Sequence, residues 1–313
     1  MEELRSRGGS SVNIRRKTLP GGLRAVVTGG AGLIGSEIVR TFRREGVSVD
    51  FLDIDEERGN RLAYECGARF HQVDISDMNA LDACLDGIFD SRGDIDIVVN
   101  CAAVVDFVPL NENTPERFMR SMAVNVLPAF EIARKLAIYR ESLPFPNSYG
   151  GRIINICSTR ARQSEAATEN YSASKGALMS LTHALMMSLS PLGITVNSIS
   201  PGWIAKPDEP LSEADHSQHP SLRVGRPADI ARACVFLCAP ANNFINGIDL
   251  PIDGGMTHRM IYTETTSHDD NIKIESVSDE DKIVEKDIRD SNAEVVAHMK
   301  GETELPLAKN IVL

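Results

Sequence analysis

The chain is short of several features that define large classes of proteins. Only 5% of its residues are aromatic, with a single tryptophan, and none of its six cysteines forms a Cys-x-x-Cys pair. No apolar run reaches the ~18 residues that a membrane-spanning helix needs. Unpaired cysteines of this kind are typical of proteins in a reducing compartment. We therefore expect a cytoplasmic protein with free thiols and no membrane span.

Positive charge is also scarce. The 33 lysines and arginines are outnumbered by 44 aspartates and glutamates, which gives a net charge of −11. Residues 264–313 contain thirteen acidic and six basic residues, so much of the acidic excess lies at the C-terminal end. No basic stripe offers a surface to nucleic acid, and we predict no nucleic-acid partner.

Three regions follow from this distribution. Residues 1–22 form a polar arm that carries both charge signs and lacks the apolar core of a secretory signal. Residues 23–258 have the length and composition of one α/β domain, which we expect to bind a dinucleotide and to carry the catalytic residues. Residues 259–313 are an acidic extension, in which Ser278-Asp-Glu-Asp resembles a capping box at the start of an amphipathic stretch over 278–300. A packed helix and a solvated tail both fit this stretch.

Histidine spacing gives little support for a metal site. His216-x-x-His219 is the one metal-like spacing, and it lies in a segment rich in Pro, Asp and Ser without an obvious third ligand. We predict no metal site and interpret this segment as an active-site lid.

Short apolar runs alternate with helical stretches along the domain. This alternation predicts an α/β fold, namely a single Rossmann-type doubly wound domain with a mostly parallel seven-stranded sheet and helices on both faces. The expected strands are 23–28, 47–54, 70–73, 95–100, 151–157, 195–200 and 249–252.

A glycine-rich turn follows the first of these strands. Gly29-Gly-Ala-Gly-Leu-Ile-Gly35 connects the strand to a helical stretch from Ser36 to Arg44. Glycines let a ligand approach the backbone, and the start of a helix offers free N–H groups. The arrangement therefore predicts a site for a pyrophosphate.

Asp53 indicates which dinucleotide is bound. It lies near the end of the second strand, eighteen residues after Gly35, where a carboxylate can hold the hydroxyls of the adenine ribose. The same carboxylate would repel the 2′-phosphate of NADP, and the glycine turn contains no Arg or Lys to offset the repulsion. We therefore expect NAD rather than NADP as the cofactor.

The second half of the domain contains a candidate catalytic group. Tyr171 and Lys175 are four residues apart in Tyr-Ser-Ala-Ser-Lys, and Ser158 lies thirteen positions upstream. On a helix this spacing places both side chains on one face. We expect the ammonium to lower the pKa of the phenol, which would allow proton exchange with an alcohol or carbonyl oxygen. Ser158 can hydrogen-bond that oxygen.

Taken together, these motifs resemble those of the short-chain dehydrogenase/reductase family, in its single-domain branch. Asn125, in Ala-Val-Asn-Val, corresponds to the helix asparagine that completes a catalytic tetrad with Ser158, Tyr171 and Lys175. The resemblance implies that Asn125 fixes a water linking Lys175 to solvent. It also implies that Lys175 holds the nicotinamide ribose.

The resemblance also implies the cofactor site. Asp74 corresponds to the acidic residue that binds the adenine, and the turn after Pro201 to the one that binds the nicotinamide carboxamide. The implied cofactor-binding residues are Gly29, Gly32, Leu33, Ile34, Gly35, Asp53, Asp74, Ile75, Asn100, Ala102, Tyr171, Lys175, Pro201, Gly202 and Ile204.

Two other functions are compatible with parts of the sequence. The glycine turn reads Thr-Gly-x-x-Gly-x-x-Gly, with Leu33 where the shorter branch has its second glycine, a pattern more typical of epimerases or dehydratases acting on sugar nucleotides. The segment after Pro201 is short for a nucleotide-sugar domain. A scaffold or redox sensor that binds NAD(H) without turnover is the other alternative, although it would have no need of Tyr171.

We predict an NAD(H)-dependent oxidoreductase that interconverts a secondary alcohol and a ketone on a small-molecule substrate, with Tyr171 as the acid/base. Family precedent also implies a homotetramer or, failing that, a dimer, built on the helices that carry Asn125 and Tyr171. Ala177, Leu178, Leu181 and Leu185 form an apolar stripe on the second of these helices. The candidates for the substrate pocket are Val104 to Phe107, Arg160, Arg162, Trp203 and 208–219.

Overall fold

The computed structural model describes residues 17–145 and 147–260. The predicted helix at 278–300 and most of the predicted arm 1–22 lie outside the described residues. Leu19, near the end of that arm, is buried in the hydrophobic core, and its backbone N–H donates to the carboxylate of Glu45 at 3.3 Å. The folded domain therefore includes residues that precede the predicted boundary at Leu23.

A single seven-stranded parallel sheet forms the centre of the domain, in the order β3-β2-β1-β4-β5-β6-β7. All the strand pairs are parallel, and each predicted strand is present. The strands are β1 (Arg24–Thr28), β2 (Ser48–Asp53), β3 (Arg69–Gln72), β4 (Ile97–Asn100), β5 (Gly151–Ile156), β6 (Ile194–Pro201) and β7 (Asp249–Ile252).

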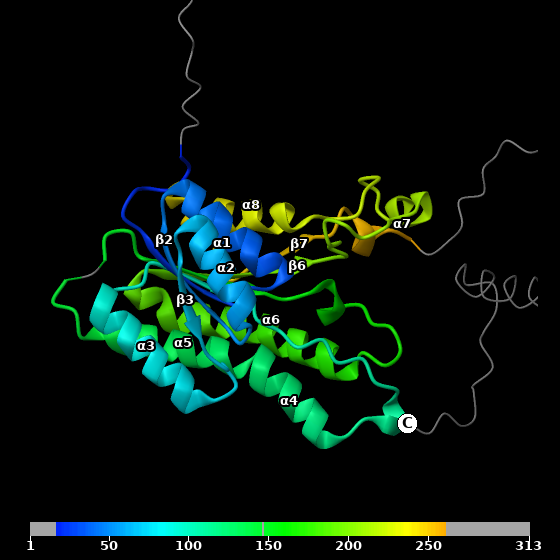
Figure 1. Cartoon of the computed structure of the whole chain (residues 1–313), viewed down its shortest axis with the longest axis horizontal. Helices are drawn as coiled ribbons and strands as arrows, with labels where there is room; N and C mark the ends of the chain where they lie inside the picture. Colours follow the sequence, from blue (N-terminus) through cyan, green and yellow to red (C-terminus); the bar gives the residue numbers. More distant parts are fainter. Residues whose placement is uncertain (1–16, 146, 261–313) are drawn as a thin grey trace, which may run out of the picture. The chain divides into compact units, whose positions relative to one another are not determined.

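Helices cover both faces of this sheet, as Figure 1 shows. Helices α1, α2 and α8 pack on one face around Phe42 and Phe51, and α3, α5 and α6 pack on the other around Leu52 and Leu85. Because both faces are covered, the central strands are buried along their whole length, which explains their continuous apolar runs. The predicted doubly wound α/β fold is confirmed. The longer helices are α1 (Leu33–Glu45), α2 (Glu56–Cys66), α3 (Met78–Arg92), α4 (Pro115–Asn125), α5 (Leu127–Glu141), α6 (Glu169–Leu189) and α8 (Pro227–Cys238), and α7 (Glu213–Ser217) is a single short turn.

Polar side chains fix where several of these helices begin. The carboxylates of Asp55 and Asp77 accept hydrogen bonds from backbone N–H groups in the first turns of α2 and α3, and the hydroxyl of Thr114 does the same for α4. These bonds satisfy donors that a helix leaves free at its start. The helix α1 differs, because its N-cap residue is Gly32 and no side chain caps it.

The strand order reverses between β1 and β4. Strand β1 pairs with β2 on one side and with β4 on the other, so the chain leaves the two strands toward opposite faces of the sheet. Ligands of open α/β sheets bind at such a point, in the crevice beyond the carboxyl ends of the strands. The topology therefore places a candidate site at the ends of β1, β2, β4 and β5.

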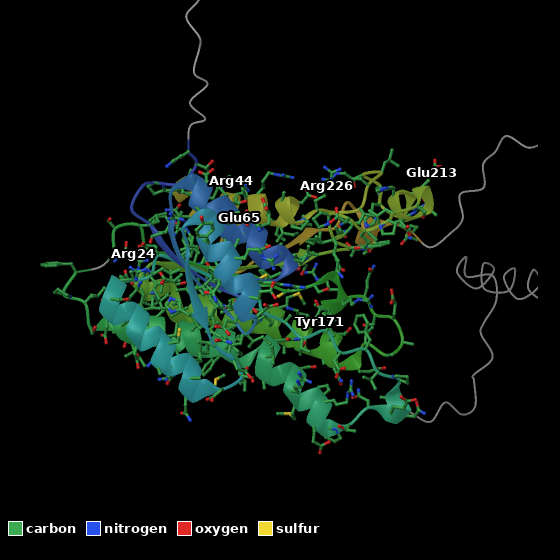
Figure 2. The ribbon with its side chains drawn as sticks, in the orientation of Figure 1. Arg24, Arg44, Glu65, Tyr171, Glu213 and Arg226 are labelled. Carbon is green, nitrogen blue, oxygen red and sulfur yellow. The ribbon has the colours of Figure 1, made fainter. Side chains whose placement is uncertain are left out.

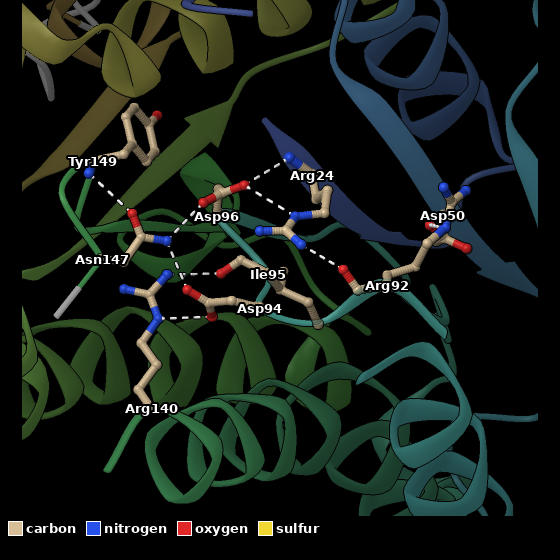
Figure 3. A network of polar contacts seen from close by, with 9 residues as sticks. All are labelled: Arg24, Asp50, Arg92, Asp94, Ile95, Asp96, Arg140, Asn147 and Tyr149. Carbon is tan, nitrogen blue, oxygen red and sulfur yellow. Dashed lines mark hydrogen bonds and ion pairs between the residues drawn. The ribbon is translucent and has the colours of Figure 1, made fainter. Parts of the chain in front are cut away.

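A buried polar network, drawn in Figure 3, lies at the other end of the strands, where β1, β4 and β5 begin. Asp94 accepts from the Arg140 guanidinium at 3.1 Å and from the Asn147 amide at 2.6 Å. The same amide donates to Asp96 at 2.8 Å. Asp96 in turn accepts from the backbone N–H of Arg24 at 2.8 Å. The network connects the starts of β1, β4 and β5 and lies away from the crevice, so we assign it a structural role.

Candidate active site

The glycine turn lies between β1 and α1 and forms one wall of the crevice. Gly29 has a φ of 65°, and a Cβ added there would lie 2.6 Å from the Cα of Ala102. A Cβ on Gly35 would overlap the carbonyl oxygen of Gly29. Glycine is therefore required at both positions, and the uncapped start of α1 offers its backbone N–H groups to an anion in the crevice.

Asp53, at the end of β2, is bonded to the backbone around the turn. Its Oδ2 accepts from the N–H of Ala31 at 2.9 Å and its Oδ1 accepts from the N–H of Asp55 at 3.1 Å. The carboxylate thus fixes the glycine turn against the end of β2. Each oxygen has further acceptor capacity for a hydroxyl group.

Asp74 occupies the corresponding place after β3. Its carboxylate accepts from the hydroxyl of Ser76 at 2.7 Å and from the backbone N–H of Ser76 at 2.9 Å. These hydrogen bonds, with a smaller contribution from the charge of Arg120, hold the pKa of Asp74 below its usual range. Asp74 is therefore an ionised acceptor at neutral pH.

A cavity of about 650 Å³ extends from the glycine turn to Tyr171. All but two of the predicted site residues line it. The lining set comprises Gly29, Gly32, Leu33, Ile34, Gly35, Asp53, Asp74, Ile75, Ala102, Ser158, Tyr171, Lys175, Pro201, Gly202 and Ile204. The exceptions are Asn100 and Asn125, which are buried behind the wall of the cavity.

Two cationic residues of this cavity were not predicted. Arg58, on α2, lines it together with Asp53, and Arg120, on α4, lines it near Asp74. Arg58 also lines a second, adjoining cavity that contains Arg40, Arg61 and Lys206. The sequence signal for Arg58 is its place five residues after Asp53, in the first turn of the following helix, whereas nothing in the sequence places Arg120 at the site.

The predicted catalytic side chains meet at the far end of the cavity. Ser158 follows β5, and Tyr171 and Lys175 lie one turn apart on α6 (Figure 2 labels Tyr171). Burial raises the pKa of Tyr171, and the nearby hydroxyl of Ser158 and the charge of Arg160 only partly oppose this effect. Tyr171 is therefore a protonated phenol at neutral pH.

Lys175 differs from its prediction in one respect. Its Nζ donates to the backbone carbonyl of Ile156 at 2.7 Å and lies 5.6 Å from the centre of the Tyr171 ring. The ammonium thus lies over the face of the Tyr171 ring. The predicted lowering of the Tyr171 pKa by Lys175 is wrong for this structure, because burial dominates and raises it. Burial also lowers the pKa of Lys175 itself.

The buried amide of Asn125 makes three hydrogen bonds that connect two parts of the site. Its Oδ1 accepts from the N–H of Val104 at 2.8 Å, and its Nδ2 donates to the carbonyl of Val104 at 3.0 Å and to the hydroxyl of Ser174 at 2.9 Å. Asn125 therefore connects the segment after β4 to the helix that carries Tyr171. Its role in fixing a water stays a prediction.

The remaining candidates for the substrate pocket differ in their places, and Arg160 and Arg162 lie outside the residues that line the cavity. Val104 and Val105 line the cavity, and the ring of Phe107 contacts that of Tyr171 edge-on, with centroids 6.1 Å apart. Trp203 packs on His219 instead, at 6.4 Å between ring centroids, and neither lines the cavity. The predicted lid, 208–219, likewise contributes nothing to the cavity lining.

Metal ligation finds no support in the part of the chain that the structure describes. There, no group of three or more His, Cys, Asp or Glu side chains is arranged to hold an ion. His216 accepts a hydrogen bond from the N–H of Val224 at 3.2 Å, and His219 is buried under α7. All six cysteines are free, and burial raises the pKa of Cys101, at the cavity wall, to about 12.

Comparisons with known proteins agree with this geometry. A family model described as enoyl-(acyl carrier protein) reductase matches residues 30–257. An uncharacterized oxidoreductase of Thermotoga maritima is 42% identical over 257 residues, which cover 77% of this chain and 98% of that protein. The solved structure of a short-chain dehydrogenase/reductase from Serratia marcescens has 30% identity and a TM-score of 0.68, covering 76% of this chain and 98% of that one. The chain belongs to the short-chain dehydrogenase/reductase family.

Membership of the short-chain dehydrogenase/reductase family makes the chain an oxidoreductase. A sorbitol dehydrogenase of Cereibacter sphaeroides is 31% identical over 252 residues, covering 75% of this chain and 97% of that protein. Relatives with such names act on CH–OH groups.

None of the described helices has the length and apolarity needed to cross a bilayer.

Proposed function

We propose that the protein is an NAD(H)-dependent oxidoreductase that interconverts a secondary alcohol and a ketone. One observation carries this proposal. The glycine turn and Asp53 line the same cavity as Ser158, Tyr171 and Lys175. An alcohol dehydrogenase exchanges a hydride with the dinucleotide and a proton with an acid/base group. Both must reach the same substrate, which a shared cavity allows.

The residues present fit a nicotinamide dinucleotide. Glycine at positions 29 and 35 lets the turn pack closely on the backbone of Ala102 and of Gly29 itself, and the start of α1 has backbone donors that no side chain occupies. Asp53 and Asp74 would hold the adenosine part, and Lys175, with the turn after Pro201, the nicotinamide part. A bound nicotinamide dinucleotide supplies or accepts the hydride.

Tyr171 moves the proton in this proposal. As a protonated phenol it donates to the oxygen of a ketone during reduction, and it accepts the proton back during oxidation of the alcohol. Ser158 donates a hydrogen bond to the same substrate oxygen and stabilises the charge that develops there. The raised pKa of Tyr171 keeps its hydroxyl protonated and able to donate a proton to a ketone.

The preference for NAD over NADP rests on Asp53. A 2′-phosphate bound at the end of β2 would meet its carboxylate at short range. Among the described residues that line the main cavity, Arg58 is the cation on the helix that follows Asp53, and its guanidinium is already paired with Asp55 at 3.4 Å. Arg58 is exposed, so its charge is largely screened by solvent.

We further propose that the subunits assemble through α4 and α5. Two residues of the stripe predicted on α6, Leu178 and Leu185, are buried within the subunit's own core and are not available for this surface. Instead Phe118, Met119 and Phe130, on α4 and α5, are exposed. A closed homotetramer or a dimer would cover them. We place this assembly in the cytoplasm, where free cysteines persist.

The test is a turnover screen with the full-length protein. NAD⁺ or NADP⁺ is offered with polyols, secondary alcohols and hydroxy acids, NADH or NADPH with the matching ketones, and absorbance of the reduced nicotinamide is followed. We expect turnover with at least one substrate pair and a preference for NAD(H). Tight NADH binding without turnover of any substrate would support the scaffold instead. Conversion of a sugar nucleotide without net change in NADH would support the epimerase.

A further inference from the structure

The ring of Phe107 contacts both Arg160 and Tyr171, the proposed acid/base residue. The guanidinium carbon of Arg160 lies 5.0 Å from the centre of the Phe107 ring. The Phe107 ring in turn meets the ring of Tyr171 edge-on, at 81°. A cation over an aromatic face is held in place without losing its hydrogen-bond donors. Phe107 therefore fixes a guanidinium next to Tyr171, close enough for its charge to act on the phenol.

The ion pair that Arg160 makes is a weak one. Its partner is Glu165, at 3.0 Å, whose side chain is 75% exposed. Exposed pairs of this kind contribute little to stability, because water solvates both partners well. An incoming carboxylate can replace Glu165 at little cost. Of the five N–H donors of this guanidinium, one has a recorded partner among the described residues.

The neighbouring arginine has a different environment. Arg162 pairs at 3.2 Å with Asp249, whose side chain is only 6% exposed. Asp249 also accepts hydrogen bonds from the hydroxyls of Ser198 and Ser200, both at 2.7 Å. Removing Arg162 from this buried carboxylate would leave a charge uncompensated. Arg162 is therefore a structural residue, and Arg160 is the arginine that is free to bind a ligand.

Other charges around this end of the cavity are either positive or neutralised. Lys175 is a buried cation that makes no ion pair among the described residues. Asp106, the carboxylate on the segment that carries Phe107, is neutralised by Arg117 and also accepts from the amide of Asn170 at 3.2 Å. An anion that enters beside Tyr171 therefore meets net positive charge.

We propose that Arg160 binds a carboxylate of the substrate, so that the substrates are hydroxy acids and the corresponding keto acids. This inference rests on the proposed function and adds its substrate class. The planar guanidinium suits a carboxylate because it can donate two parallel hydrogen bonds. The carboxylate displaces Glu165 and the carbinol oxygen lies at Tyr171.

The test compares acids with neutral esters of the same shape. Full-length protein is assayed with NAD⁺ on 2-, 3-, 4- and 5-hydroxyhexanoate and on their methyl esters. The wild-type kcat/KM for the best acid should exceed that for its ester by about 10- to 100-fold, the range expected for a charge-assisted bidentate contact. Arg160→Gln should remove this preference, mainly through a higher KM for the acid, so that the loss in kcat/KM is much larger for the acid than for the ester.

Two further variants separate binding from other effects. Arg160→Lys keeps the charge without the planar fork and should restore part of the acid preference. Arg162→Gln removes a nearby positive charge and should leave the ratio of acid to ester unchanged, even where it lowers stability. Thermal melting and NADH titration of each variant establish that it is folded and binds cofactor.

Three results would overturn the inference, and they are distinguishable. If Arg160→Gln lowers kcat/KM by the same factor for acid and ester, Arg160 acts through the pKa of Tyr171 and does not bind a carboxylate. Wild-type turnover of the esters or of neutral alcohols such as sorbitol, but not of the acids, would refute the carboxylate anchor and leave the proposed function intact. NADH binding without turnover of any alcohol would contradict the proposed function, and the anchor with it.

Discussion

The ammonium of Lys175 donates a 2.7 Å hydrogen bond to the backbone carbonyl of Ile156. Ile156 is the last residue of β5, so the bond ties the face of α6 that carries Lys175 to the carboxyl ends of the strands. Lys175 is only 2% exposed, and burial lowers its pKa. A buried cation held at the ring face of Tyr171 is costly for folding, which is a reason to assign it to ligand binding and not to stability.

The first prediction concerns cofactor choice. The native protein should bind NADH more tightly than NADPH, because the 2′-phosphate meets the carboxylate of Asp53. Asp53→Asn keeps an acceptor for the N–H of Ala31 but removes the charge. The difference in affinity between NADH and NADPH should therefore become smaller. Adding Ile54→Arg, at an exposed position that lines the cavity, should reverse it.

Fluorescence titration of both reduced cofactors measures this effect. Arg58→Gln is the matched control, since it removes a charge from the same cavity without touching Asp53. Tighter binding of NADPH than of NADH by the native protein would contradict the assignment of the preference to Asp53.

The second prediction concerns assembly. Light scattering of the native protein at micromolar concentration should report a homotetramer or a dimer. Met119→Glu, which puts a charge on the exposed apolar face of α4, should yield smaller species. Tyr64→Glu also puts a charge in place of a large exposed side chain, but on α2 in the other helical layer. It should not change the size of the assembly. A monomeric native protein would refute the assembly.

The third prediction concerns the buried network of Figure 3. Arg140→Met removes the cation from Asp94 and leaves a buried carboxylate without its ion-pair partner. The free energy of unfolding should fall by about 3–5 kcal/mol. Arg134→Gln breaks the exposed pair with Glu131 on the same helix and should cost less than about 1 kcal/mol. Similar losses in urea denaturation of both variants would contradict the assignment.

The fourth prediction concerns pH and His71. A hydrogen bond from its imidazole to the buried carboxylate of Asp50, at 2.8 Å, raises the pKa of His71 to about 9. A group whose pKa is raised on folding stabilises the protein fully below its unfolded value of about 6.5, and this contribution is lost as pH rises through about 9.

The measurement is Tm as a function of pH. The Tm of the native protein should fall between pH 7 and pH 10, and the curve of His71→Gln should be flatter, because its side chain does not titrate. Parallel curves for the two proteins would show that His71 has no raised pKa in the folded state.

Motif spacing was sufficient to predict most of the fold and the lining of the site. The glycine turn, Asp53 and the pair Tyr171 and Lys175 each depend on neighbours in sequence, so their local geometry is fixed by one turn or one helix. The strands were recognisable because burial on both faces demands uninterrupted apolar residues.

Contacts between distant segments were not predictable in this way. The stacking of Arg160 on Phe107 joins residues 53 positions apart, and the contact of Phe107 with Tyr171 joins two segments that are also distant in sequence. The direction of the Tyr171 pKa was consequently mispredicted from its spacing to Lys175. The apolar stripe on α6 could not be divided from sequence into residues that cover the sheet and residues that face outward, because a helical pattern alone does not tell which layer each residue packs against.

The central claim is that Tyr171 exchanges a proton with the substrate. Tyr171→Phe removes the hydroxyl and keeps the ring that packs against Phe107. The most direct measurement is the kcat of the purified variant on the best substrate, together with its affinity for NADH. We predict that kcat falls by roughly 10²–10⁴-fold or more while NADH affinity stays close to that of the native protein. A kcat near the native value in the Phe variant would contradict the account.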